Sequence, residues 1–177
     1  MSFREVGEVS QHSHDISKST KAFDNTVGES GEVRHIKTIN EDLAGTTYPG
    51  TDVCYRKRVI WLNGERVEGV FPVFDSSFDT QLPRNLWMAS DERQFKYCTE
   101  RLKAQVESDP DLAAKFTARQ LQQIKNCEPR ISGYTWHHNE ISGKMQLVDA
   151  GTHAICRHTG GKSLWGGGAD YRGLEGK

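Results

Sequence analysis

One window near the C-terminal end of this chain restricts the fold more than any other, because it holds four of the seven histidines among alternating strand and turn signals. Residues 134–136, Tyr-Thr-Trp, are aromatic or β-branched and favour a strand. Residues 139–144 carry turn-forming side chains and a glycine that tolerates positive φ. Residues 145–148 resemble a short second strand. The window therefore predicts a β-hairpin.

A short helix is predicted directly after this hairpin. Asp149 can cap the first turn of a helix that runs from about Ala150 to Arg157. The Gly160-Gly161 pair is expected to end that helix. The predicted order is strand, turn, strand and short helix, with histidines on the first strand and on the helix.

The spacing of the histidines suggests two different roles for them. Adjacent residues of a strand point to opposite faces, so His137 and His138 do not readily bind one ion together. One of the pair can be a metal ligand while the other acts as a base. His153 lies one turn into the predicted helix, and His158 lies just beyond its end. On spacing alone, solvated or hydrogen-bonded structural histidines remain the alternative.

Several sequence motifs together resemble the HNH/endonuclease VII superfamily, within it the branch named for its Trp-His-His motif. The motifs are Tyr-Thr-Trp-His-His-Asn-Glu, Gly-Lys-Met-Gln-Leu-Val-Asp, His153, His158-Thr-Gly-Gly and Leu-Trp-Gly-Gly-Gly, with Gly69–Asp75, Leu82-Pro83 and Gln94–Cys98 upstream. The resemblance covers about residues 40–168. Domains of that branch commonly form the C-terminal toxic tip of bacterial polymorphic toxins, so the resemblance implies a nuclease.

The resemblance also implies a role for each histidine. His137 would be a metal ligand on the first strand of a ββα-metal (His-Me finger) module, and His153 would be the second ligand. His138 would be the general base that activates water for attack on a phosphodiester. His158 would be either a third ligand or a contact to the scissile phosphate. The implied cofactor is a divalent ion, with Zn²⁺, Ni²⁺, Mn²⁺ and Mg²⁺ all open.

Two further parts of the implied site are less defined. The chain lacks an asparagine at an obvious middle position of the HNH pattern, and Gln146 or Asp149 takes that structural role. Between residues 130 and 168 four Lys or Arg stand against two acids, which gives a mildly basic region. Arg157 and Lys162 belong to this region and are the predicted substrate-binding residues.

Composition bears on the compartment. No apolar run approaches the roughly 20 residues needed to span a bilayer, and the first residues lack the apolar centre of a signal peptide. A larger fused protein or a secretion system is therefore expected to deliver the protein, which would act in a bacterial cytoplasm. The four cysteines form no Cys-x-x-Cys pair, so free thiols are expected, and a zinc site that uses Cys156 is the alternative.

Upstream of the window the sequence predicts supporting structure. Residues 1–38 are polar and resemble a tail or linker. Asn63-Gly64 lies between two β-rich runs and predicts a hairpin. Ser90 is expected to cap a helix that ends at Asp109-Pro110, and Thr117 a helix that ends near Asn126. The nuclease domain is thus predicted over residues 39–168, with a C-terminal tail at 169–177.

The combined expectation is a small α+β domain with an N-terminal β-hairpin, a central helical pair and a C-terminal ββα-metal module. Its expected activity is metal-dependent endonucleolytic cleavage of DNA, as an antibacterial toxin neutralised in the producer by a cognate immunity protein. Two alternatives remain. One is a nuclease of the same fold that cleaves RNA or processes DNA. The other is a non-catalytic nucleic-acid-binding module that zinc holds together.

Overall fold

The Asn63-Gly64 turn forms a β-hairpin as predicted. Strands β2 (Cys54–Leu62) and β3 (Glu65–Val73) pair along their whole length, from Cys54 opposite Val73 to Leu62 opposite Glu65. Asn63 and Gly64 have φ of 51° and 82°, the left-handed values that a tight hairpin turn requires. The hairpin therefore follows directly from its turn residues.

The computed structural model describes residues 31–168. Residues 33–168 form one compact unit. Strand β1 (Arg34–His35) pairs in parallel with β3 in this unit, so the last residues of the stretch assigned to a tail join a sheet. Residues 1–30 of the predicted N-terminal tail, and the predicted tail at 169–177, lie outside the described residues.

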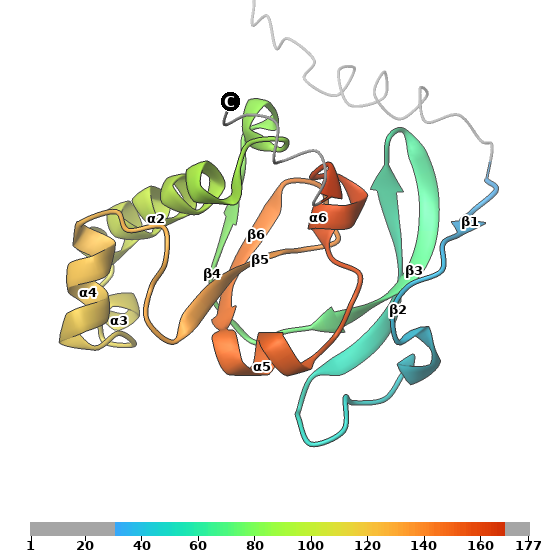
Figure 1. The fold of residues 1–177 in the computed structure, drawn as a ribbon, viewed down its shortest axis with the longest axis horizontal. Coiled ribbons are helices and arrows are strands. Elements are labelled where there is room, and N and C mark those ends of the chain that lie inside the picture. The colour runs from blue at the N-terminus through green and yellow to red at the C-terminus, as the bar shows by residue number, and fades with distance from the viewer. Residues whose placement is uncertain (1–30, 169–177) are drawn as a thin grey trace, which may run out of the picture. The chain divides into compact units, whose positions relative to one another are not determined.

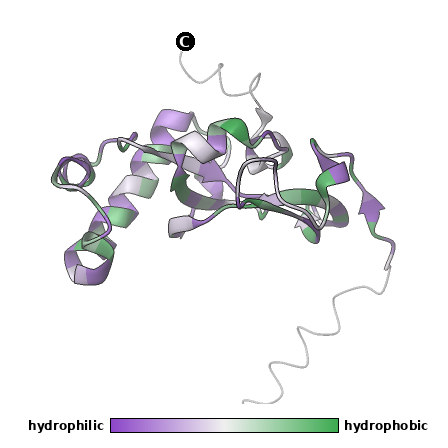
Figure 2. Ribbon diagram, turned by 90° about the horizontal axis from the view of Figure 1, so that it is seen from below, coloured by the Kyte–Doolittle hydropathy of each residue, from purple (hydrophilic) through white to green (hydrophobic). Residues whose placement is uncertain are grey.

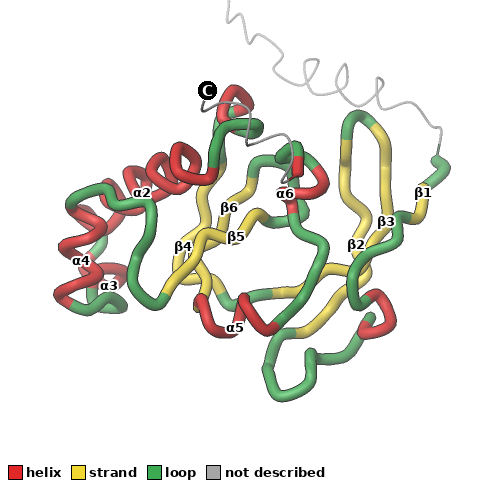
Figure 3. The backbone as a smooth tube through the Cα atoms, in the orientation of Figure 1, coloured by secondary structure: helices red, strands yellow, loops and turns green. Residues whose placement is uncertain are grey.

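The predicted histidine hairpin is the middle and one edge of a second three-stranded sheet. Strands β5 (Tyr134–His138) and β6 (Lys144–Asp149) pair antiparallel, and β4 (Ser76–Gln81) pairs with the other side of β6. The order β4-β6-β5 is visible in Figure 3, where the three strands run side by side.

Three helices form the second layer on this sheet. Helix α2 (Asp91–Ser108) starts at the predicted cap, where the Ser90 hydroxyl accepts a hydrogen bond from the amide of Arg93. The short α3 (Pro110–Ala113) follows, and a Thr117/Gln120 capping box starts α4 (Ala118–Lys125). Figure 1 shows these helices on one side of the β4-β6-β5 sheet and the β2–β3 hairpin on the other.

The main core lies between α2 and the second sheet. Leu102 and Cys98 of α2 are fully buried, as are Met145 and Leu147 of β6. The indole of Trp136 is buried there too, and its Nε1 donates to the hydroxyl of Thr99 on α2 at 3.3 Å. Figure 2 shows the helices with both hydrophilic and hydrophobic residues, as expected of elements with one buried face. Helix α2 therefore fixes the strand that carries His137 and His138.

The C-terminal helices differ from the sequence prediction. Helix α5 (Ala150–Ile155) starts at its predicted cap, Asp149, but ends before Arg157. The last carbonyls have other partners: the Tyr55 hydroxyl donates to the Arg157 carbonyl, and His158 pairs with the Cys156 carbonyl. Residues 156–158 thus make one long-range and one local contact in place of another helical turn.

The glycine pair starts a helix instead of ending one. Gly160 is the N-cap of α6 (Gly161–Leu164), and the Trp165 indole after it donates to the carbonyl of Asn139 at 2.8 Å. A Cβ atom at Gly161 would overlap that carbonyl and the Trp165 indole. Glycine is required here for the close approach of α6 to the end of β5. Two 3₁₀ turns, η1 (Glu41–Leu43) and η2 (Arg84–Leu86), complete the described elements.

Candidate metal centre

Three of the four clustered histidines converge. A ring nitrogen of each of His137, His153 and His158 lies within 4.8 Å of a ring nitrogen of the other two. The Nδ1 atom of His137 is 3.2 Å from Nε2 of His153. Strand β5 supplies the first, helix α5 the second and the loop after α5 the third. The strand-strand-helix order predicted from the sequence therefore brings these imidazoles together.

One aromatic side chain forms a wall against all three rings. Phe74 lies between β3 and β4, and its ring centroid is 4.9 Å from that of His137, 5.2 Å from that of His153 and 5.3 Å from that of His158. Phe74 is buried. The histidines are therefore held in an apolar environment, which favours their neutral, metal-binding form.

The hydrogen bonding of the three histidines fits a cation. The Nδ1 atom of His158 is 2.6 Å from the Cys156 carbonyl, so Nδ1–H donates and the lone pair remains on Nε2. The Nε2 atom of His137 is buried and has no hydrogen-bond partner within residues 31–168. Three neutral imidazoles, one of them with an orphaned buried nitrogen, would be a suitable donor set for a first-row divalent ion.

Electrostatics keep the cluster neutral. Burial lowers the pKa of His137 well below the usual 6.5, and the neighbouring histidines lower it further. Burial and His158 lower the pKa of His153 to about 4. Burial also lowers the pKa of His158. All three side chains therefore carry a lone pair at neutral pH, as metal ligation requires.

His138 lies apart from this cluster. It faces α2, where its Nε2 is 2.7 Å from Oε1 of Gln94 and 3.9 Å from a carboxylate oxygen of Asp91. Asp91 is paired in turn with Lys162 at 2.8 Å. Burial, followed by the charge of Lys162, lowers the pKa of His138 to about 3. The adjacent histidines of β5 therefore have separate surroundings, as the alternation along a strand predicts.

One family model matches the sequence that builds this cluster. The model of the DNase/tRNase domain of colicin-like bacteriocins covers residues 63–160, more than half of the chain. The chain belongs to this family. The matched range contains all four clustered histidines. No curated protein and no solved structure gives a significant match. The protein is therefore a nuclease toxin domain.

The remaining predicted site residues of this colicin-like nuclease domain have distinct surroundings. The Gln146 amide accepts from Nδ2 of Asn139 and donates to Asp79, at 2.9 Å and 3.1 Å, so it joins the hairpin loop to β4. Asp149 accepts from the amide of Thr152 as the cap of α5. Arg157 is exposed after α5. Cys156 is buried and lies outside the group of converging nitrogens.

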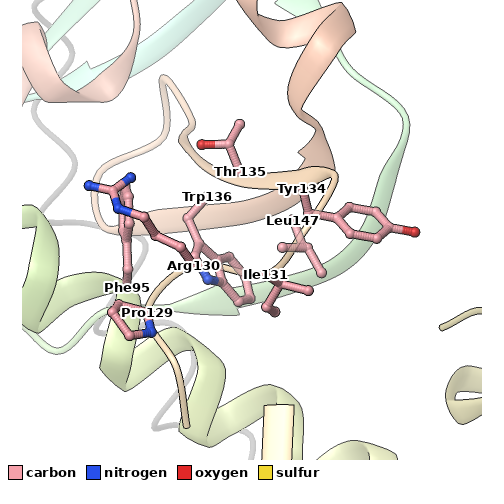
Figure 4. A pocket seen from close by; sticks show the side chains of 8 residues that line it. All are labelled: Phe95, Pro129, Arg130, Ile131, Tyr134, Thr135, Trp136 and Leu147. Carbon is pink, nitrogen blue, oxygen red and sulfur yellow. The ribbon is translucent and has the colours of Figure 1, made fainter. Parts of the chain in front are cut away.

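Two pockets beside β5 and α5, the elements that carry His137 and His153, are unsuited to bind the phosphate of a nucleotide. A cavity of about 60 Å³ between α2 and β5 has room for only a few water molecules. Figure 4 shows Arg130 at its rim, where the guanidinium lies 5.6 Å from the centroid of the Phe95 ring. A wider pocket beside α5 is lined by Asp52, Asp75 and Asp149, and no Lys or Arg of residues 31–168 lines it. Its carboxylates would repel a phosphodiester.

Two residues that contact the histidines lie within the motifs that carry the family resemblance, but the sequence-based prediction gives neither of them a role in the site. Gln94 stands four residues before Cys98, on the apolar stripe of α2, and a polar side chain on such a stripe is a usable signal. The contact of Phe74 with the histidines gives no comparable signal, because it depends on the path of the chain between two sheets. Within residues 31–168, no helix is long and apolar enough to cross a membrane.

The metal-free domain is expected to lose stability as the pH falls from 7 to 5. The folded-state pKa values of His138 and His153 lie below the ordinary 6.5, so in this range the unfolded chain binds protons that the folded chain does not. Each such histidine lowers the free energy of unfolding by up to about 1.4 kcal/mol per pH unit, and its contribution is complete above pH 6.5. Urea unfolding in EDTA, followed by tryptophan fluorescence, measures this slope.

A matched pair of variants identifies the source of that slope. His153→Gln should flatten the dependence on pH, and the control Thr152→Ala, which changes the neighbouring position of α5 and removes no titratable group, should leave it as in the wild type. Equal stability of the wild type at pH 7 and pH 5 would contradict the expectation.

Proposed function

We propose that this domain is a metal-dependent endonuclease of the HNH type, from the Trp-His-His branch, and that DNA is its substrate. The observation that carries the proposal is the convergence of His137, His153 and His158 on a strand-strand-helix module. The match to a family of bacteriocin nucleases supports the same chemistry. Membership of that family makes nucleic-acid cleavage the activity of the domain, and the cluster indicates how it is performed.

In the proposed arrangement, His137, His153 and His158 hold one divalent ion. Imidazole ligands suit Zn²⁺ and Ni²⁺ well and also suit Mn²⁺, whereas Mg²⁺ prefers oxygen ligands. When bound, the ion supplies a Lewis acid for the charge that develops on the phosphate oxygens. His158 is assigned as the third ligand, because its Nε2 keeps a lone pair next to the other two rings.

His138 is proposed to take the proton from the attacking water. It is neutral at physiological pH, it is outside the ligand cluster, and it precedes the loop that packs against α6. Lys162 forms an ion pair with Asp91, whose carboxylate also lies beside His138. We propose that Lys162 and Arg157 contact the phosphodiester backbone. Gln146 is the better candidate for the middle HNH position, because it ties the hairpin loop in place while Asp149 caps a helix.

The biological setting is proposed on the same basis. A nuclease toxin has to be neutralised in the cell that makes it, so a cognate immunity protein is expected as a partner. The domain is proposed to act in the cytoplasm of a competing bacterium, after delivery by a larger protein or a secretion system. The nuclease domain is assigned to residues 39–168, preceded by β1, which pairs with β3.

The purified protein should convert supercoiled plasmid to nicked and linear DNA only when a divalent ion is present. Treatment with EDTA should abolish cleavage, because the three imidazoles alone supply no charge to the phosphate. Addition of Zn²⁺, Ni²⁺, Mn²⁺ or Mg²⁺ one at a time should restore it and identify the ion. Cleavage of tRNA and not of plasmid by the same sample would move the substrate to RNA, and cleavage that persists in EDTA would reject the metal centre.

A further inference from the structure

The amide of Gln94 makes a close polar contact with His138. Gln94 is fully buried in α2, and its Nε2 lies 2.7 Å from the carbonyl oxygen of Leu86 and 2.8 Å from that of Trp87. Its Oε1 lies 2.7 Å from Nε2 of His138. A side-chain amide has two N–H donors, and both have an acceptor here. Each polar atom of the side chain is therefore engaged.

These contacts decide the orientation of the amide. The two backbone carbonyls can only accept hydrogen bonds, so the amide nitrogen must be the atom that faces them. The amide oxygen, which can only accept, is then the atom that faces His138. An oxygen 2.7 Å from an unprotonated ring nitrogen would bring two lone pairs together in a buried place. Nε2 of His138 must therefore carry a hydrogen and donate it to Gln94.

The orientation of the amide also fixes the tautomer of His138. A neutral imidazole has one N–H and one lone pair, so with Nε2 protonated the lone pair is on Nδ1. Asp91 does not compete for this role, because its carboxylate is 3.9 Å from Nε2, too far for a hydrogen bond, and is paired with Lys162.

We infer that Gln94 is a positioning residue that holds His138 with its proton on Nε2 and presents Nδ1 as the proton-accepting atom. This inference rests on the proposed function for its catalytic consequence. In the reaction the proton of the attacking water moves to Nδ1, while the Nε2 proton stays in its hydrogen bond to Gln94. The segment from η2 to the first turn of α2, which is far from the histidine hairpin in sequence, thereby sets the tautomer and orientation of His138.

The tautomer can be read directly by ¹⁵N nuclear magnetic resonance of the full chain loaded with Zn²⁺, which is diamagnetic. In the wild type, His138 should show a protonated Nε2 and an unprotonated Nδ1. A wild-type spectrum with the proton on Nδ1 would overturn the inference, whatever the activity of the sample. This reading does not depend on cleavage, so it separates a wrong assignment of Gln94 from a wrong substrate or reaction.

The variant Gln94→Met keeps the length of the side chain and removes the acceptor. It should give a mixture of His138 tautomers and lower kcat on a short duplex DNA about tenfold with KM unchanged, since one hydrogen bond of about 1.4 kcal/mol is lost. The matched control is Gln120→Met, which removes a side-chain amide of α4 that is hydrogen-bonded to the backbone of Thr117 and of Ser132. A folded Gln94→Met protein with the wild-type tautomer and kcat would contradict the role.

Discussion

Replacing His138 by alanine is expected to lower the rate of DNA cleavage by about 10² to 10⁴, the range that loss of a general base commonly gives. The affinity for the metal ion should stay within about twofold of the wild-type value, because His138 is outside the group of converging nitrogens. Cleavage kinetics at saturating metal and calorimetric titration with the same metal measure the two quantities.

The size of the loss in cleavage rate shows whether His138 is a general base or only a structural residue. Alanine at this position leaves Oε1 of Gln94 without its partner, which costs about 1–3 kcal/mol of stability. Thermal unfolding of the variant shows whether it is folded at the assay temperature. The control His35→Ala removes an exposed histidine paired with Glu41 and should cleave like the wild type. A folded His138→Ala protein with wild-type cleavage would reject His138 as the base.

The second large effect is expected from His153→Ala, which should lower metal affinity more than about 100-fold and abolish cleavage at ordinary metal concentrations. The variant leaves two of the three converging imidazoles, and one of the remaining pair has lost its 3.2 Å neighbour. Loss of a ligand exceeds the 10–100-fold that loss of a ligand's hydrogen-bonding partner typically costs. Titration with Zn²⁺ measures the affinity.

Thermal unfolding gives an independent test of the same site. Metal at 100 times its dissociation constant should stabilise the wild type by about 2.7 kcal/mol, and the same concentration should stabilise His153→Ala far less. The control Thr152→Ala changes the neighbouring position of α5 and keeps the backbone amide that Asp149 caps. If His153→Ala binds metal as tightly as Thr152→Ala, the three histidines are not the ligands.

Much of the fold follows from local signals in the sequence. Asn63-Gly64 supplies the two positive φ values of the first hairpin, and Ser90, Thr117 and Asp149 each accept the hydrogen bond expected of a helix cap. The predicted α+β class is confirmed by the two three-stranded sheets and the helices packed with them. These features depend on a few neighbouring residues, which explains why they can be read from the chain.

The rest depends on partners distant in sequence. Strand β4, Ser-Ser-Phe-Asp-Thr-Gln, has little strand character of its own and becomes a strand because β6 offers it an edge. The end of α5 is decided by Tyr55, which is 102 residues away from the carbonyl that it contacts. The separation of the three converging histidines from His138 is expected from alternation along β5. The packing of Phe74 against these three histidines, and the contact of Gln94 with His138, arise only from tertiary structure.

The dependence of the histidine hairpin on β4, Phe74 and α2 limits how the domain can be divided. A fragment limited to residues 130–168 would carry every candidate ligand, yet β6 would lose the strand that pairs with its outer edge. Its histidines would lose the Phe74 ring, and His138 would lose Gln94. An unpaired strand edge invites aggregation. A transplantable form of this nuclease centre, for protein engineering or for domain exchange between toxins, therefore has to begin no later than Phe74.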